Sequence, residues 1–234
     1  MLGRSRAARL ALLLAIASLG ASLAGCGGSS DNGVASKTAP EILAATRAAA
    51  QSASSVHVNS ESGIGITKSA LDAALGTQQG HTRLSFAGLR IEEIRTGSTL
   101  YVKGNRVLDA RLESTLGVKI PSGVWLKGTV GGPLPGTALT SITKELPVIL
   151  SSPGQLTKGP TTTIDGKPAI ELKQTTPLYT GTLYVATTGK PYPILLRKTG
   201  RETGEITFTG WNDPITVSAP ANALDISKLE RKAG

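Results

Sequence analysis

The feature that most restricts the fold of this chain is a series of short, mostly alternating apolar segments separated by turn residues. Strand-like segments are expected at 56–66, 82–86, 90–95, 99–103, 123–127, 161–164, 169–173, 182–185, 193–197 and 205–209. An apolar residue at every second position is typical of strands with one buried face. Asp165-Gly166, between two of these segments, is a strong signal for a two-residue hairpin. The pattern predicts one large antiparallel sheet built mainly from sequential hairpins.

Other stretches have helical spacing, and one of them carries a start signal. Thr38 followed by Glu41 matches a capping box, which predicts a helix over about residues 39–53. Leucines at four-residue steps predict a second helix over about 106–117. Ser69–Leu75 is interpreted as a short helical insertion.

Residues 138–150 form the most apolar helical stretch. The positions that share one helical stripe are Leu139, Ile142, Leu146 and Ile149. Pro147 removes a helical hydrogen bond, so a kinked helix or two short helices are expected. We expect the stripe to cover one face of the sheet. Ordinary core packing is the commoner role of such a stripe, and the lining of a ligand cavity is the alternative.

The start of the chain has the layout of an export signal. Three arginines precede an uncharged apolar run over residues 10–24. This run of about 15 residues is shorter than the roughly 20 that a membrane-spanning helix needs. Leu23-Ala24-Gly25-Cys26 follows and resembles the lipobox of bacterial lipoproteins. Cys26 is also the only cysteine, so no disulfide partner exists within the chain.

These features predict that the signal is cut before Cys26 and that lipid is attached to its thiol. The lipobox resemblance implies two or three acyl chains, such as palmitate, and more than one chain is needed for stable anchoring. We therefore expect a signal peptide over 1–25, a flexible Gly/Ser-rich tether over 26–37 and a single folded domain over 38–234. The expected location is the extracytoplasmic face of the cell membrane.

The composition and motifs of the chain restrict the functions that it can have. Without residues 1–25, 22 of the 25 Lys and Arg remain against 16 Asp and Glu, a net charge of +6. This charge fits simple solubility, and attraction to an anionic lipid surface is the sharper alternative. Nucleic acid is not expected as a partner, because the chain is exported and has no nucleic-acid motif. Two histidines and one cysteine leave little for a metal site. Without a nucleophile elbow or a phosphate loop, we predict neither enzymatic activity nor a cofactor.

Several segments recur in an order that is familiar from one family. They are the lipobox with Cys26, Ser54–Val58, Gly97–Asn105, Trp125, Thr163–Pro168, Gly181–Ala186, Pro191–Ile194 and Phe208–Pro214. Together, over about residues 38–227, they resemble the actinobacterial LppX/LprG-type lipoproteins and, more distantly, the LolA-like lipoprotein carriers. The stretch 67–80 and the Gly/Pro-rich loop at 128–136 depart from that pattern.

The resemblance implies an α+β fold: a strongly curved antiparallel sheet, or incomplete barrel, with helices packed on its concave side. It implies that a lipid or an acylated molecule is held in an apolar cavity between sheet and helices. The implied partners are the membrane, a lipid or glycolipid ligand and an envelope transporter. A second interpretation stays open, in which the same fold is a protein-interaction or sensor module without lipid cargo and with a small or filled cavity.

Overall fold

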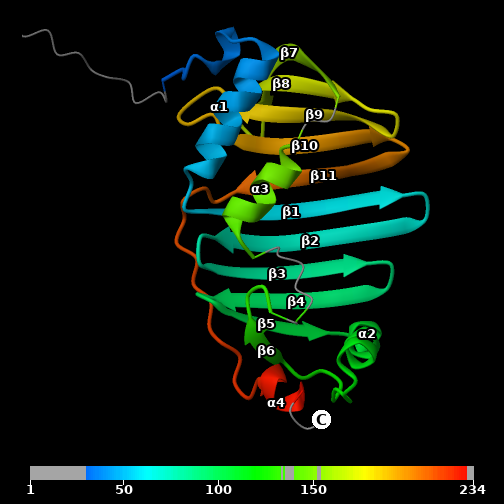
Figure 1. Cartoon of the computed structure of the whole chain (residues 1–234). Coiled ribbons are helices and arrows are strands. Elements are labelled where there is room, and N and C mark those ends of the chain that lie inside the picture. Colours follow the sequence, from blue (N-terminus) through cyan, green and yellow to red (C-terminus); the bar gives the residue numbers. More distant parts are fainter. Residues whose placement is uncertain (1–29, 133, 135–139, 152–153, 231–234) are drawn as a thin grey trace, which may run out of the picture.

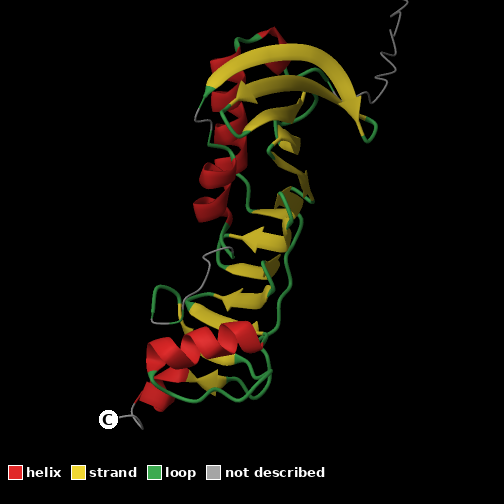
Figure 2. Cartoon of the chain, turned by 90° about the vertical axis from the view of Figure 1, so that its right-hand side faces the viewer, coloured by secondary structure: helices red, strands yellow, loops and turns green. Residues whose placement is uncertain are grey.

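The computed structural model describes residues 30–132, 134, 140–151 and 154–230 (Figure 1). The expected signal peptide, Cys26 and Leu139 lie outside these residues. Within them, the chain forms one 12-stranded, mostly antiparallel sheet that is strongly curved. Figure 2 shows helices lying along one side of this curve. The predicted α+β architecture is therefore confirmed.

The strands are β1 Ser55–Ile64, β2 Thr67–Gly76, β3 Gln79–Phe86, β4 Leu89–Thr96, β5 Thr99–Gly104, β6 Leu126–Thr129, β7 Gln155–Ile164, β8 Lys167–Thr175, β9 Tyr179–Ala186, β10 Pro193–Gly200, β11 Glu202–Thr209 and β12 Leu224–Asp225. The helices are the 3-10 turn η1 Val34–Ser36, α1 Ala39–Gln51, α2 Arg106–Leu116, α3 Ile142–Ile149 and α4 Ile226–Glu230. The predicted strands and hairpins thus occur close to their expected places, and α1 and α2 match two of the predicted helices.

The sheet consists of two meanders joined by a seam. Its strand order is β12-β6-β5-β4-β3-β2-β1-β11-β10-β9-β8-β7, so β1 pairs with β11 although the two are far apart in sequence. At this seam Val58 lies opposite Phe208, and both side chains are buried. β12 pairs with β6 in parallel. The seam makes one continuous concave surface from both halves of the chain.

The hairpins follow the turn chemistry of the sequence. Asp165 and Gly166 have φ angles of 50° and 76°. Positive φ at both central residues is the type I′ geometry that favours Asp-Gly between antiparallel strands. Ala87 and Gly88, between β3 and β4, adopt the same signs with φ of 48° and 82°.

The concave face is covered by helices at both ends. Buried residues of α1 and α3 form the largest apolar core with β1, β2, β8, β9 and β11; it includes Ile42, Leu43, Val58, Leu75, Ile142, Leu146, Leu172, Val185 and Phe208. A second core joins α2 and α4 to β4–β6. Arg47 of α1 donates hydrogen bonds from Nε and Nη2 to the carbonyl of Leu150, at 3.1 and 2.8 Å. These bonds fix the C-terminal end of α3 against α1 (Figure 1).

Three expectations need correction. Ser69–Leu75 lies within β2 and not in a helix, because the buried side chains of Ala73 and Leu75 alternate with outward ones and β2 pairs along its length with β1 and β3. The predicted tether is wrong for residues 31–37, since Val34 is only 1% exposed and packs in the main core. Of the two outcomes expected at Pro147, two short helices are not found, because α3 runs as one short helix through this residue.

The predicted capping box of α1 is present. The Glu41 carboxylate accepts hydrogen bonds from the Thr38 backbone N–H at 2.9 Å and from its hydroxyl at 2.6 Å. These two bonds lower the pKa of Glu41 below its usual value. The helix therefore begins where the sequence predicts.

Candidate functional site

An open hollow lies over the β1–β5 half of the sheet. Pairing places Ser60, Leu71, Leu84, Ile91 and Gly104 in one row across five strands. This row faces the same side as Val58 and Ala73, because side chains alternate along a strand. The row forms the floor of a hollow of about 430 Å³ that is open to solvent. Leu71, Leu84 and Ile91 supply the apolar surface of this hollow.

The hollow is open because the covering helices leave this part of the sheet free. α1 and α3 pack toward the β7–β11 half, whereas α2 packs against β4 and β5. Gly104 permits the close approach of α2, since a Cβ there would overlap the side chain of Leu108. The helices therefore cover the sheet on either side of the hollow.

A second hollow, of about 270 Å³, lies between the helices and the sheet. Its helical wall is Leu43 together with residues 148–151, and its strand wall includes the apolar side chains Leu156, Leu172, Leu183, Leu196 and Ile206. This is the place between concave sheet and helices where the family resemblance implied a cavity. Its size is close to the lower end of ligand sites, which span about 300–1,000 Å³.

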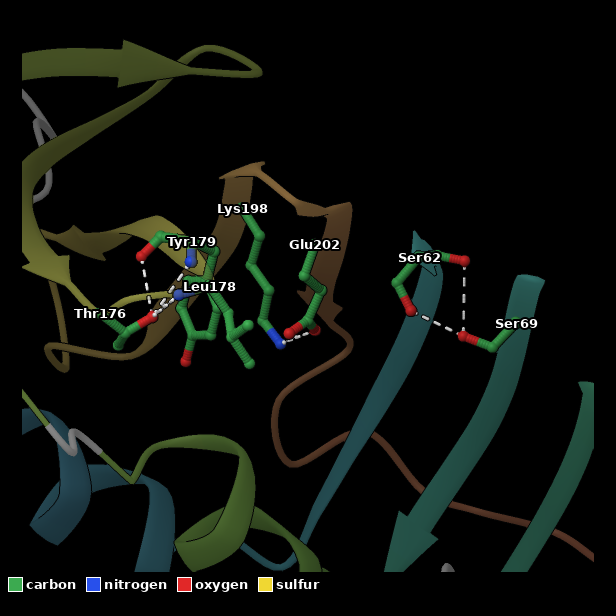
Figure 3. A network of polar contacts seen from close by, with 7 residues as sticks. All are labelled: Ser62, Ser69, Thr176, Leu178, Tyr179, Lys198 and Glu202. Atoms are coloured by element: carbon green, nitrogen blue, oxygen red, sulfur yellow. Dashed lines mark hydrogen bonds and ion pairs between the residues drawn. The ribbon is translucent and has the colours of Figure 1, made fainter. Parts of the chain in front are cut away.

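One end of this smaller hollow is polar. Lys198 Nζ lies 2.6 Å from Glu202 Oε1 and 4.7 Å from the centre of the Tyr179 ring (Figure 3). Gln174 also lines the hollow, and its Nε2 is buried without a hydrogen-bond partner among the described residues. An apolar space that ends in hydrogen-bond donors suits an amphiphilic molecule.

The residues predicted to contact a ligand are divided between core and hollow. Ile142 and Leu146 are 2% and 1% exposed and belong to the main core. Ile149 lines the smaller hollow. Leu139, like Cys26, lies outside the described residues. The structure thus brings only Ile149 of this stripe to the wall of either concave hollow, within the part of the chain that it describes.

Sequence reasoning missed most of the side chains that form the hollows. Leu71, Leu84 and Ile91 belong to alternating strands, so the signal was present in the sequence, but alternation does not say which buried face is left uncovered. Lys198 was counted simply as a charged residue. Its position facing Tyr179 depends on the pairing of β9 with β10, where Lys198 is opposite Gly181.

Charged residues gather on the convex face of the same strands. His57 Nε2 lies 3.0 Å from Asp72 Oδ1, and Glu92 Oε1 lies 2.8 Å from His81 Nε2 and 3.4 Å from Arg83 Nε. These are cross-strand ion pairs on partly or largely exposed side chains, which contribute little to stability. Among the described residues, no group of three His, Cys, Asp or Glu side chains is placed to hold a metal ion.

No helix in the described part of the chain is both long enough and apolar enough to cross a bilayer.

Comparison with solved structures identifies the class of fold. LprF from Mycobacterium bovis aligns with 83% of this chain and 100% of its own, at 16% sequence identity and a TM-score of 0.52. The Mycobacterium tuberculosis lipoprotein LppX aligns with 76% of this chain and 99% of its own, at 17% identity and a TM-score of 0.44. MucB, in the Pseudomonas aeruginosa MucA/MucB complex, aligns over 79% of this chain and 59% of its own, at 16% identity and a TM-score of 0.39.

The chain therefore has the LppX/LolA-like curved-sheet fold that its sequence resemblance implied. LprF is the structure that carries this likeness, and it extends over the whole of that protein. No family model and no curated protein sequence matches the chain.

Proposed function

We propose that this protein is a lipid-anchored, non-enzymatic protein of the cell envelope that holds the acyl part of a lipid on the concave face of its sheet. The observation that carries the proposal is the hollow of about 430 Å³ with Leu71, Leu84 and Ile91 in its floor. The smaller hollow beneath α1 and α3 adds a second apolar space with a polar end.

The energetics of burial support this proposal. Removing an acyl chain from water contributes roughly 0.8 kcal/mol for each buried methylene. The concave floor is already shaped by strand pairing, so little ordering of the protein is needed when a chain lies on it. Binding of this kind requires no catalytic group.

The anchor in this proposal is Cys26, lipidated after removal of residues 1–25. It rests on the basic and apolar leader, on Leu23-Ala24-Gly25-Cys26 and on the lack of any other cysteine. The lipid would hold the protein at the extracytoplasmic face of the cell membrane. Mass spectrometry of the mature protein tests this part: acyl mass on an N-terminal Cys26 supports it, and a free Cys26 thiol contradicts it.

The cargo is tested by native mass spectrometry and lipid extraction on residues 27–234 expressed in an actinobacterial host. We expect about one lipid per protein. Ser60→Phe places a ring on the concave floor and should lower the lipid occupancy. His57→Phe is the matched control on the same strand, because residue 57 is exposed, points to the convex side and does not line the hollow.

Both variants are compared by circular dichroism and urea denaturation, so that a loss of lipid is not confused with a loss of fold. Lipid-free protein from that host would contradict the lipid-holding function. It would favour the interaction module on the same fold. Equal lipid content in the two phenylalanine variants would place any bound lipid away from the larger hollow.

A further inference from the structure

Large apolar side chains protrude along one edge of the sheet. We call this the hairpin edge: residues 64–68, 86–90, 103–107, 176–179 and 200–202, which lie at the right of Figure 1. The described residues contain six exposed large hydrophobic side chains, and five of them are here: Ile64, Ile66, Phe86, Val107 and Leu178. The sixth, Val148, is on α3. Figure 2 looks onto this edge.

The backbone holds Leu178 in an outward position. Its carbonyl accepts hydrogen bonds from the N–H groups of Arg201 and Glu202, at 3.0 and 3.2 Å. Its own N–H donates to the Thr176 hydroxyl at 3.3 Å, and the N–H of Tyr179 donates to the same oxygen at 3.1 Å (Figure 3). The exposure of this leucine is therefore a property of a well-bonded turn.

Ile66 is presented in a similar way by a two-residue turn. Ile64 pairs with Thr67, so Gly65 and Ile66 are the turn residues between β1 and β2. Gly65 supplies the positive φ of 57° that the turn needs, and Ile66 is 100% exposed. The chain places isoleucine at a position where polar residues are usual.

The charge of the hairpin edge is strongly positive. Its five segments contain Lys68, Arg90, Lys103, Arg106 and Arg201. Their one acidic residue is Glu202, which is bound to Lys198 of the preceding strand. Arg106 lies 3.3 Å from Glu113 of α2, so Lys68, Arg90, Lys103 and Arg201 provide most of the positive charge. On the opposite edge, the turns at 76–79 and 96–99 consist of Gly, Thr, Gln and Ser, and the two remaining turns contribute Asp165, Lys167 and Lys190.

The hairpin edge is also continuous with the larger hollow. Ile64 and Phe86 lie on the concave side, because Ser62, Ser69 and Phe86 form the row that follows Ser60 and Leu71. An apolar molecule that leaves the floor of the hollow along β1–β3 therefore reaches exposed apolar side chains at this edge.

We propose that the hairpin edge docks on the surface of an anionic lipid bilayer. Because Asp31 is bridged to Thr188 at the opposite edge, this bilayer is a different one from the membrane that would hold Cys26. Neighbouring hairpin tips are about 10 Å apart, since strands are spaced at about 4.8 Å. Separate apolar side chains with cations between them fit the fluid interface of a bilayer. Each apolar side chain can insert between lipid headgroups, and each cation can bind an anionic headgroup. A protein partner would instead be favoured by one contiguous apolar patch. Docking does not depend on cargo, so it can succeed or fail independently of the proposed lipid-holding function.

The test is vesicle co-sedimentation of residues 27–234, which lack Cys26 and include every described strand and helix. We expect binding to vesicles of phosphatidylglycerol and phosphatidylcholine, and weaker binding at high salt. The triple variant Ile66→Ser, Phe86→Ser, Leu178→Ser should bind at least about tenfold more weakly, because apolar burial is lost. Val217→Ser is the control and should bind like the unchanged protein, because this partly exposed position in the loop between β11 and β12 lines neither hollow.

The cations are tested separately. Lys68→Gln, Arg90→Gln and Arg201→Gln together should remove the preference for anionic over neutral vesicles. Lys167→Gln with Lys190→Gln, two exposed cations on the opposite edge, should leave that preference intact. All variants alter exposed or partly exposed side chains, and their urea midpoints report whether the fold is kept.

Three results would overturn the proposal. One is equal vesicle binding by the apolar triple variant and the unchanged protein. Another is no binding to anionic vesicles at all. The third is that light scattering shows a dimer that the triple variant abolishes while vesicle binding persists, which would assign the edge to a second copy of this chain.

Discussion

Lys198 and Glu202 face each other across the β10–β11 turn, with Nζ 2.6 Å from Oε1 and both side chains 20% exposed. The Tyr179 ring lies on the other side of the ammonium group, 4.7 Å from Nζ to the ring centre. The polar end of the smaller hollow is therefore a neutral pair and not an isolated cation. A ligand group that lies there meets hydrogen-bond donors without a net charge.

Replacing the lysine should destabilise the fold. Lys198→Met leaves the half-buried Glu202 carboxylate without its donor, and we expect a loss of about 1–3 kcal/mol in the free energy of unfolding. Urea denaturation measures this loss. Lys190→Met, at an exposed loop position, is the control and should change stability by less than about 0.5 kcal/mol. Equal effects at the two positions would show that the pair with Glu202 contributes nothing.

Two positions of the α3 stripe should behave differently. Leu146→Ala removes a fully buried side chain and should cost about 2–5 kcal/mol, with little effect on lipid occupancy of the folded protein. Ile149→Ala, at the wall of the smaller hollow, should cost less and lower the lipid occupancy. Urea denaturation and native mass spectrometry on the same samples separate the two effects. The reverse order of stability losses would contradict this assignment.

The seam should be sensitive to Phe208. Phe208→Ala opens a cavity opposite Val58 and should lower the free energy of unfolding by about 3–5 kcal/mol. Phe86→Ala provides a matched comparison, because Phe86 is 51% exposed and its loss should change stability by less than about 0.5 kcal/mol. Chemical denaturation of both variants checks the difference. Similar losses of unfolding free energy in the two variants would show that the β1–β11 contact contributes little to stability.

The start of α1 should respond to acid. Hydrogen bonds from Thr38 lower the pKa of Glu41 from its ordinary 4.5, so the ionised carboxylate stabilises the folded state above that value. This contribution is lost as the pH falls through the lowered pKa. Glu41→Gln should therefore lose less stability on acidification than the unchanged protein. Urea midpoints at neutral pH and well below 4.5 measure this, with Glu61→Gln as an exposed control.

The sequence was most informative where local chemistry decides the structure. Asp165-Gly166 predicted its hairpin because few residues adopt two successive positive φ angles. Thr38 and Glu41 predicted the start of α1 because the capping bonds are local. The sequence was ambiguous at Ser69–Leu75, where Leu71 and Leu75 satisfy helical spacing while Ala73 and Leu75 satisfy strand spacing. Pairing with two neighbouring strands decided that case.

The candidate site could not be predicted from local patterns, because it depends on contacts between residues that are far apart in the sequence. Leu84 and Ile91 could be predicted as inward residues of strands, but whether they line an open hollow depends on where α2 and α3 stop covering the sheet. The pairing of β1 with β11 is of the same kind, because a simple meander predicts only neighbours in sequence. The exposed Ile66 carried a visible signal, an apolar residue beside a glycine with positive φ, although the strand expected at 56–66 included it.

The seam also has a consequence for the order in which this protein can fold. Val58 can pack against Phe208 only after residue 208 has left the ribosome or the export channel. A chain that is still held there near its C-terminal end therefore cannot form β11. Until then β1 and β10 are both open edges, which invite pairing with other chains. We expect the slow step of folding to be the late closure of this long loop. A nascent chain of this kind needs protection until its last strands are free.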